Sequence, residues 1–356
     1  MHQLSTFPAR AGIEMGNMLV TPTISVVIPN RNDSKHLIKC LDSVLNQDIP
    51  PDQIIVVDDQ STDDSLDVIR EKLLNVAGTT IVVNHTCLGT MGALNEGLKR
   101  ATSDYVLFLS SNDYVEKNIF ERAKSCIATS DHPGVWSATV REVDESGRNL
   151  HLYPSPVVAP TDTFLPPDKC IRLAKTVGHW FTGTTLIYHR ETLQQIGGFD
   201  IAYQGLADML AALTVASIKG ASFSPEPLGV MRKHEGGLYW RTITNLPELD
   251  IILKKMENSG RQLSPALFTP GFCDVMARRI RFSAIRAFDD NSWLPYSNLW
   301  RGYRYSMLRV ACRLLGNNRK LQLALAFVLL RPPFDLIAII WYRLFGRLIL
   351  SFRHND

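Results

Sequence analysis

Short apolar runs alternate with helical patterns over the first part of the chain. The runs TISVVIPN (23–30), QIIVVDD (53–59), TTIVVNH (79–85) and DYVLFLSSND (104–113) are rich in β-branched residues and typical of buried strands. Between them, apolar residues recur at helical spacing, as in DSKHLIKCLDSVLNQ (33–47). Strands that alternate with helices predict a mostly parallel sheet flanked by helices, which is an α/β fold.

The pattern is less regular after residue 134. A proline-rich loop is expected over 153–167, a strand at TGTTLIYH (182–189), a helix at LADMLAALTVASIKG (206–220), and a strand and loop at LGVMRKHEGGL (228–238). From about residue 241 the pattern is helical. We therefore predict a flexible leader at 1–22, an α/β domain at 23–240 and a helical region at 241–356.

The helical region differs in charge from the rest. From residue 271 onward 14 lysines and arginines stand against 5 acidic residues, whereas the first 270 residues carry 24 against 30. A basic region of this kind predicts an anionic partner, for which a membrane surface is favoured and nucleic acid is not expected.

Three apolar segments lie in this basic region, at 298–316, 321–330 and 334–350. The last two are shorter than the roughly 20 residues that a membrane-spanning helix needs. We therefore expect amphipathic helices in the membrane interface, with Trp341 and Tyr342 at headgroup level. The alternative is a helical subdomain that packs on the α/β domain or on another subunit, as in a homo-oligomer.

Six scattered cysteines form no CxxC pair, and the first 19 residues lack the apolar core of a signal peptide. Both observations favour a cytoplasmic protein, with the basic region holding it at the inner face of the membrane.

Polar residues cluster where three predicted strands end, in PNRND, DDQSTDD and SSND. In open α/β sheets, ligands bind at the carboxyl ends of the strands. Helix capping explains Ser61 to Asp64. It does not explain two carboxylates, Asp58 and Asp59, at the very end of an apolar strand, where their repulsion is costly without a use.

VVIPNRND, IIVVDDQSTDDS and LFLSSND, in this order and spacing, resemble family 2 of the inverting nucleotide-sugar glycosyltransferases, which have the GT-A fold. The resemblance continues at GTTLIYHRETLQQIGGFD and covers roughly residues 23–238. It implies transfer of a sugar from a nucleotide-diphosphate sugar to a hydroxyl of a lipid-linked or polysaccharide acceptor.

The resemblance also assigns donor-binding residues. Pro29 and Asn30 match the positions that seat the nucleoside, and Asp59 matches the aspartate that accepts a hydrogen bond from the nucleobase. Asp58 is expected to hold the loop.

Family members usually end the fourth strand with an Asp-x-Asp signature for a divalent cation, Mn²⁺ or Mg²⁺. Here those two positions are Ser110 and Asn112. We expect Asp113 to be the charged ligand, and Ser111 and Asn112 to be neutral hydrogen-bonding groups at the diphosphate. His234 matches a histidine that closes over the diphosphate, as a further metal ligand or a phosphate donor. Because Ser110 and Asn112 replace the two aspartates of the signature, three alternatives stay open: a weakened metal site, turnover without a metal, and lost activity.

Asp208 matches the second member of an acidic pair at the start of a helix, whose first member is Ala207 here. The resemblance makes Asp208 the general base for the acceptor hydroxyl. Without the resemblance, an aspartate favoured by the helix dipole would explain it. The rival functions are a transferase to a soluble or protein acceptor, with an oligomerising tail, and an inactive sugar-nucleotide-binding subunit.

Overall fold

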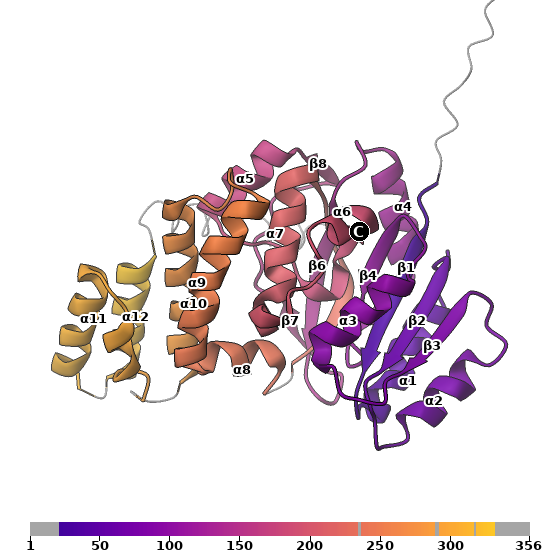
Figure 1. The fold of residues 1–356 in the computed structure, drawn as a ribbon, viewed down its shortest axis with the longest axis horizontal. Coiled ribbons are helices and arrows are strands. Elements are labelled where there is room, and N and C mark those ends of the chain that lie inside the picture. The colour runs from indigo at the N-terminus through magenta and orange to yellow at the C-terminus, as the bar shows by residue number, and fades with distance from the viewer. Residues whose placement is uncertain (1–20, 234–235, 289–291, 317, 332–356) are drawn as a thin grey trace, which may run out of the picture.

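The computed structural model describes residues 21–233, 236–288, 292–316 and 318–331 (Figure 1). Most of the predicted leader, the apolar segment at 334–350 and His234 lie outside these residues. In the part described, one mixed sheet runs through the molecule in the order β3-β2-β1-β4-β9-β6-β10-β5, with β7 beside β6 and β8 beside β10. The strands are β1 (Ile24–Asn30), β2 (Gln53–Asp58), β3 (Thr79–Val83), β4 (Tyr105–Phe108), β5 (Tyr114–Val115), β6 (Val135–Val143), β7 (Asn149–Leu152), β8 (Thr163–Leu165), β9 (Ile187–His189) and β10 (Ala221–Arg232).

The four strands predicted first are parallel: β1 pairs with β2 and β4, and β2 with β3. The helices that connect and cover the sheet are α1 (Ser34–Leu45), α2 (Ser65–Leu73), α3 (Gly89–Arg100), α4 (Ile119–Ala128), α5 (Pro167–Thr176), α6 (Arg190–Gln195) and α7 (Ala207–Lys219). The α/β prediction is therefore confirmed.

Alternate residues of β1 face two different cores. Val26 and Ile28 belong to the core that includes residues of α1, α2 and α4, whereas Val27 belongs to the core on the other face. Gly97 in α3 lies against Val27 so closely that a Cβ on it would be 2.2 Å from a valine methyl carbon. The absence of a side chain at residue 97 therefore sets the distance between α3 and the sheet.

Two strand predictions were wrong in part, and the loop expected at 153–167 contains the short strand β8 (Thr163–Leu165). The expected strand at 104–113 ends at Phe108, because the N–H of Asp113 bonds to the carbonyl of Ser110 and turns the chain. The expected strand at 182–189 begins with the 3-10 helix η1 (Gly183–Thr185) and only then becomes β9, which is antiparallel to β4. Both changes fall where the polar side chains gather.

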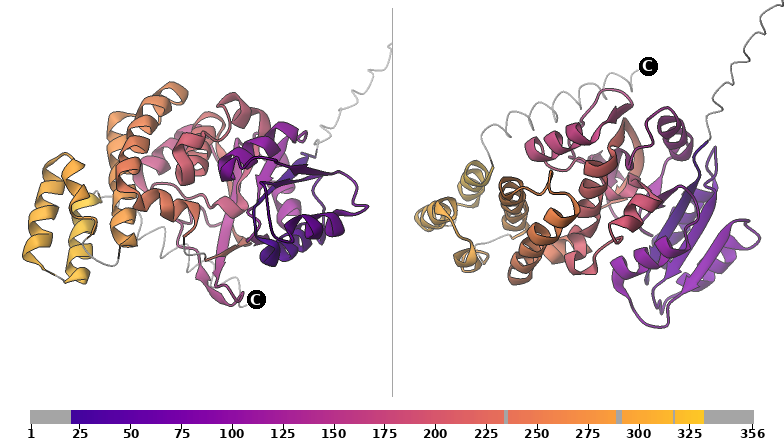
Figure 2. Two further views of the ribbon diagram at one scale, coloured as in Figure 1. Left: turned by 60° about the horizontal axis from the view of Figure 1, so that its bottom comes forward. Right: turned by 45° about the horizontal axis from the view of Figure 1, so that its top comes forward.

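The helical region continues the fold outward from α7, as Figures 1 and 2 show. The 3-10 helix η2 (Ile201–Leu206) packs on α8, α8 on α10, α10 on α12, and α12 on α11. The elements are α8 (Leu238–Thr244), α9 (Leu246–Leu263), α10 (Pro270–Ala287), η3 (Tyr296–Leu299), α11 (Tyr303–Leu314) and α12 (Arg319–Leu330). One apolar core includes both Val27 and Leu330, so the core continues across residue 240.

Among the described residues, the stretch Ile201–Lys219 alone has the length and apolar composition of a membrane-spanning helix. Of the most apolar 18 residues in this stretch, 56% are buried inside the protein. Because α7 packs against α5 and β6, we describe it as a core helix.

Candidate active site

The end of β1 is tied to the loop after β2. Asn30 is only 2% exposed, and its amide nitrogen donates to Asp58 Oδ1 at 3.0 Å and to Ser61 Oγ at 3.2 Å. Asp58 Oδ2 accepts the N–H of Ser61 at 3.0 Å. Asp58 thus holds the loop, as expected. Ser61 does not cap α2, because its hydroxyl accepts from Asn30 and from the N–H of Asn32 instead.

Asp59 points to a different loop from Asp58. Its Oδ1 accepts the amide of Asn84 at 2.9 Å and the N–H of Leu88 at 2.8 Å. Its Oδ2 accepts the N–H of Gly89 at 2.8 Å and the thiol of Cys87 at 3.3 Å. Burial raises the pKa of Asp59, but these hydrogen bonds outweigh it and hold the pKa below its ordinary value. Since a carboxylate accepts about four hydrogen bonds, a nucleobase donor would have to replace one of them, most easily the weak thiol donor.

Polar side chains of the segment after β4 bond with one another or with distant elements. Ser110 Oγ donates to Asn112 Oδ1 at 2.7 Å, and Ser111 Oγ donates to Asp33 Oδ2 at 2.9 Å. The buried carboxylate of Asp113 accepts the Thr184 hydroxyl at 2.7 Å and the N–H of Arg232 at 2.9 Å. Burial raises the pKa of Asp113 to about 6, against those two hydrogen bonds. Asp113 therefore joins β4 to η1 and β10.

These contacts bear on the predicted metal site. Among the described residues, no three His, Cys, Asp or Glu side chains gather as a metal-binding group. Both oxygens of Asp113 already accept internal hydrogen bonds, and the two Asp-x-Asp positions, Ser110 and Asn112, bond to each other. Hard cations need several free oxygen ligands. Asp113 is the one carboxylate of the segment after β4, so the described residues alone do not complete a site for a divalent cation, and His234 lies outside them.

Asp208 lies in the first turn of α7. Its Oδ1 accepts the N–H of Met209 at 2.7 Å. Its Oδ2 would lie 3.4 Å from a Cβ atom added to Gly183, so the carboxylate is next to the Gly183 backbone. Burial raises the pKa of Asp208, with the Met209 hydrogen bond opposing the shift. Gly183 is the residue before Thr184, which bonds to Asp113. The 3-10 helix η1 therefore contacts both Asp113, directly before β5, and Asp208, at the start of α7.

The helical region reaches this site through α8. A Cβ on Gly205 would lie 2.6 Å from the Tyr239 backbone, so η2 and α8 are in direct contact just before Asp208. Burial raises the pKa of the Tyr239 hydroxyl, the Ser283 hydroxyl and the Arg286 guanidinium lower it, and the Asp208 carboxylate raises it again. Tyr239 of α8 is therefore close enough to Asp208 to be affected by its charge, and Ser283 and Arg286 of α10 act on the same Tyr239 hydroxyl. The sequence pattern did not indicate this, because these residues lie outside the motifs.

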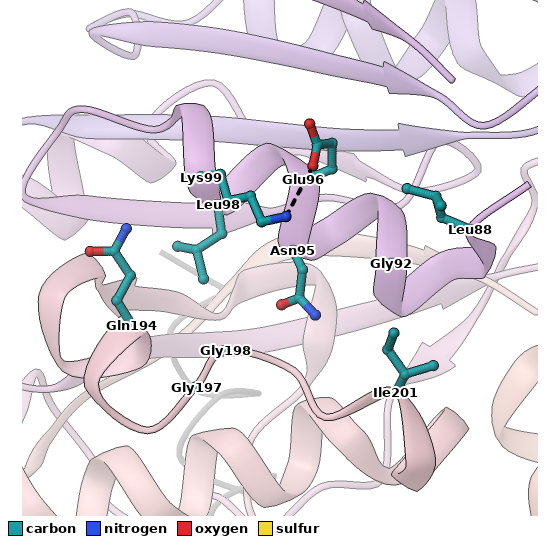
Figure 3. A pocket seen from close by; sticks show the side chains of 10 residues that line it. All are labelled: Leu88, Gly92, Asn95, Glu96, Leu98, Lys99, Gln194, Gly197, Gly198 and Ile201. Carbon is teal, nitrogen blue, oxygen red and sulfur yellow. Dashed lines mark hydrogen bonds and ion pairs between the residues drawn. The ribbon is translucent and has the colours of Figure 1, made fainter. Parts of the chain in front are cut away.

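A cavity of about 480 Å³ lies between α3 and the segment from α6 to η2 (Figure 3). It contains none of the predicted site residues. The cavity borders the loop at 84–89 through Leu88, whose N–H donates to Asp59. Asn95 lines this cavity. Its side-chain nitrogen donates to the Phe199 carbonyl at 2.7 Å, and its side-chain oxygen accepts the Phe199 N–H at 2.9 Å. Asn95 therefore holds the glycine-rich turn before η2 against α3.

Comparison with known proteins supports the interpretation of these motifs. Residues 25–197 match the model of glycosyl transferase family 2. A poly(ribitol-phosphate) beta-glucosyltransferase of Bacillus spizizenii is 38% identical over 95 residues, which is 26% of this chain and 15% of that protein. A dolichyl N-acetyl-alpha-D-glucosaminyl phosphate 3-beta-D-2,3-diacetamido-2,3-dideoxy-beta-D-glucuronosyltransferase of Methanococcus voltae is 35% identical over 102 residues, 28% of this chain and 32% of that protein. The chain thus aligns with a third or less of the length of these two relatives.

Solved structures show the same fold at low identity. S. aureus TarS 1-349 superposes with a TM-score of 0.55 at 19% identity, covering 94% of this chain and 92% of that chain. The mannosyltransferase PcManGT from Pyrobaculum calidifontis, in complex with GDP-Man and Mn²⁺, superposes with a TM-score of 0.53 at 19% identity, covering 90% and 87%. The family match covers the four parallel strands and the polar loops that follow them, so residues 25–197 belong to glycosyl transferase family 2, and the solved structures share the GT-A fold of the chain.

Proposed function

We propose that the protein transfers a sugar from a nucleotide-diphosphate sugar to an acceptor hydroxyl, with inversion at the anomeric carbon. The observation that carries this proposal is the position of Asp208. Its carboxylate lies against η1, whose Thr184 also bonds to Asp113 directly before β5, and burial raises the pKa of Asp208. A carboxylate with a raised pKa is a stronger base for a hydroxyl than an exposed carboxylate of ordinary pKa.

In the proposed reaction, Asp208 takes the proton of the acceptor hydroxyl. The acceptor oxygen attacks the anomeric carbon from the face opposite the nucleotide and forms the new glycosidic bond. The bond between the anomeric carbon and the diphosphate oxygen breaks, and the nucleoside diphosphate leaves with the electron pair. One displacement of this kind inverts the anomeric configuration.

The remaining residues would hold the donor. Pro29 and Asn30 end β1 beside the Asp58 loop, and Asp59 organises the neighbouring loop at 84–89. Ser111 and Asn112 offer neutral groups for the diphosphate. Arg31 was not selected from the sequence. It is exposed at the end of β1 and donates to Cys87 at 2.8 Å, close to Asp59, which makes it a candidate cation for the donor.

A divalent cation on the diphosphate, with Asp113 and His234 as ligands, stays a prediction. When bound, such a cation would offset the negative charge of the leaving group. Calorimetry can test it by titrating Mn²⁺ with and without nucleoside diphosphate, in the wild type and in Asp113→Asn. A site completed by the nucleotide predicts tight metal binding only with nucleotide present, and little in the variant. Nucleotide binding that is strong and indifferent to metal would show that the segment after β4 acts without a cation.

The acceptor is proposed to be a lipid-linked or polysaccharide chain at the cytoplasmic face of the membrane. The names of the two relatives, one acting on a polymer and one on a dolichyl phosphate glycan, support this class, as does the basic helical region. A soluble or protein acceptor, with the tail serving oligomerisation, is the second candidate.

The test is turnover by the purified full-length chain with a panel of nucleotide sugars. Release of nucleoside diphosphate identifies the donor, and NMR of the product reports the anomeric configuration. We expect a β-linked product from an α-linked donor. Donor binding without transfer or hydrolysis would favour the inactive sugar-nucleotide-binding subunit. A product that retains the α-configuration would contradict inversion.

A further inference from the structure

The outer side of α11 presents a row of apolar side chains to solvent. Tyr303, Met307, Val310 and Leu314 recur at intervals of three and four residues, so they share one face of the helix. Their side chains are 54% to 82% exposed. The opposite face of α11 is buried in the core through Tyr305, Leu308 and Cys312. The exposed row is therefore not the side by which α11 packs on the protein.

The charge around this row has one sign. The described residues 292–331 contain seven lysines and arginines and no aspartate or glutamate. Three of these cations, Arg301, Arg313 and Lys320, are exposed, and none has an ion-pair partner in the described part of the chain. Arg304 lies on one flank of the apolar row and Arg313 on the other. An apolar strip between cations is complementary to a surface that is apolar inside and anionic at its rim, which is the chemistry of an anionic lipid bilayer.

The position of α11 suits contact with a flat surface. Figures 1 and 2 place it at the end of the molecule farthest from β2 and β3. Its 12 residues measure about 18 Å along the axis, too short for the ~30 Å core of a bilayer. A helix of this length with one apolar face lies along the interface rather than across it.

We infer that this α11 face, defined by Tyr303, Met307, Val310 and Leu314 with Arg301, Arg313 and Lys320 around it, docks the protein on anionic membranes. The inference rests on the membrane-face acceptor of the proposed function and names the surface that makes the contact. It also predicts how the active site is oriented. Successive contacts between α11, α12, α10, α8 and η2 connect the lipid-facing end to α7, which carries Asp208.

Co-sedimentation with vesicles tests this inference without donor or acceptor, so its failure and the failure of the transferase proposal are distinguishable. The probes are phosphatidylcholine vesicles with and without about 30 mol% phosphatidylglycerol. We expect Met307→Ser/Val310→Ser/Leu314→Ser to lower partitioning onto anionic vesicles roughly tenfold or more, because three apolar side chains no longer enter the interface. We expect Arg301→Gln/Arg313→Gln/Lys320→Gln to lower it roughly fivefold per cation on anionic vesicles only.

The matched control is Leu74→Ser/Ile251→Ser, since these residues are 70% and 68% exposed on other parts of the surface. All three variants alter exposed side chains, and their thermal unfolding should match the wild type. Equal loss in the control, or full binding by the triple serine variant, would overturn the inference. So would a change from dimer to monomer in the triple serine variant, measured by sedimentation velocity, because the face would then bind a second copy of the chain.

Discussion

At the scale of single residues, Asp59 is the most heavily bonded carboxylate of the candidate site. In Asp59→Asn the amide group must face a donor, so one or two of the four hydrogen bonds are lost. We expect this variant to lose about 1–3 kcal/mol of unfolding free energy at pH 7. Urea unfolding measures the loss.

The pH dependence of that loss follows from the lowered pKa. The folded pKa of Asp59 lies below its unfolded value, so the unfolded state binds the proton more tightly in the acid range. The carboxylate stabilises the fold above the unfolded pKa, and this contribution is lost as pH falls through the folded pKa. The difference between the wild type and Asp59→Asn should therefore shrink at pH 3. Asp48→Asn, at an exposed position, is the control; a difference that grows in acid would contradict the account.

The sequence located these polar residues but not their bonds. Asp113 pairs with Thr184, 71 positions away, and with the Arg232 backbone, 119 positions away. Ser61, expected as a helix cap, bonds to Asn30 instead. Local patterns indicate that a polar residue stands at the end of a strand. They do not encode a partner that only the packed sheet brings near.

At the scale of elements, the contact between β1 and α3 depends on Gly97. In Gly97→Ala the new methyl group would overlap Val27, so α3 must move or the valine must change rotamer. We expect a loss of about 1–3 kcal/mol, as for other overpacked cores. Calorimetric unfolding measures it, and Gly97→Ala/Val27→Ala should recover part of the loss.

Gly271→Ala is the control for this substitution, because nothing lies within 4 Å of its Cβ position in the first turn of α10. A Gly97→Ala protein as stable as this control would show that α3 is free to shift.

The early elements were predictable because each carries its own periodic pattern. β1, β2 and β3 match the expected apolar runs, and α1 and α7 match the expected helical spacing. The segments at 104–113 and 182–189 were predicted as continuous strands because half of each segment is apolar and β-branched. The other half of each segment forms a turn. Each turn is closed by local backbone hydrogen bonds, and the hydrogen bond between Thr184 and Asp113 joins the two turns across 71 positions.

At the scale of the whole molecule, the helical region is part of the core. Asp250 in α9 and Arg281 in α10 form an ion pair at 2.7 Å, and Arg281 also donates to the Tyr305 hydroxyl of α11. Trp293 and Trp300 stack, and both are buried. A chain cut at Pro295 would lose Trp300, Tyr305 and Leu308 from this packing.

We therefore expect the truncated chain to melt at a clearly lower temperature than the full-length protein, or to aggregate. Dynamic light scattering and thermal unfolding measure the outcome. A soluble truncated chain with unchanged stability would instead show that α11 and α12 are not needed for the packing of the rest.

The central claim is that Asp208 is the base of an inverting sugar transfer. The most direct measurement compares turnover of the wild type and Asp208→Asn with the donor identified by the screen, together with donor affinity for each. We predict a loss of turnover of roughly 10²–10⁴-fold with donor affinity little changed, because the variant keeps the shape but cannot take the proton. We also predict that wild-type kcat/KM falls as pH drops through the raised pKa of Asp208, and that this acid limb is absent in the variant. Full turnover in Asp208→Asn, or an unchanged acid limb, would contradict the account.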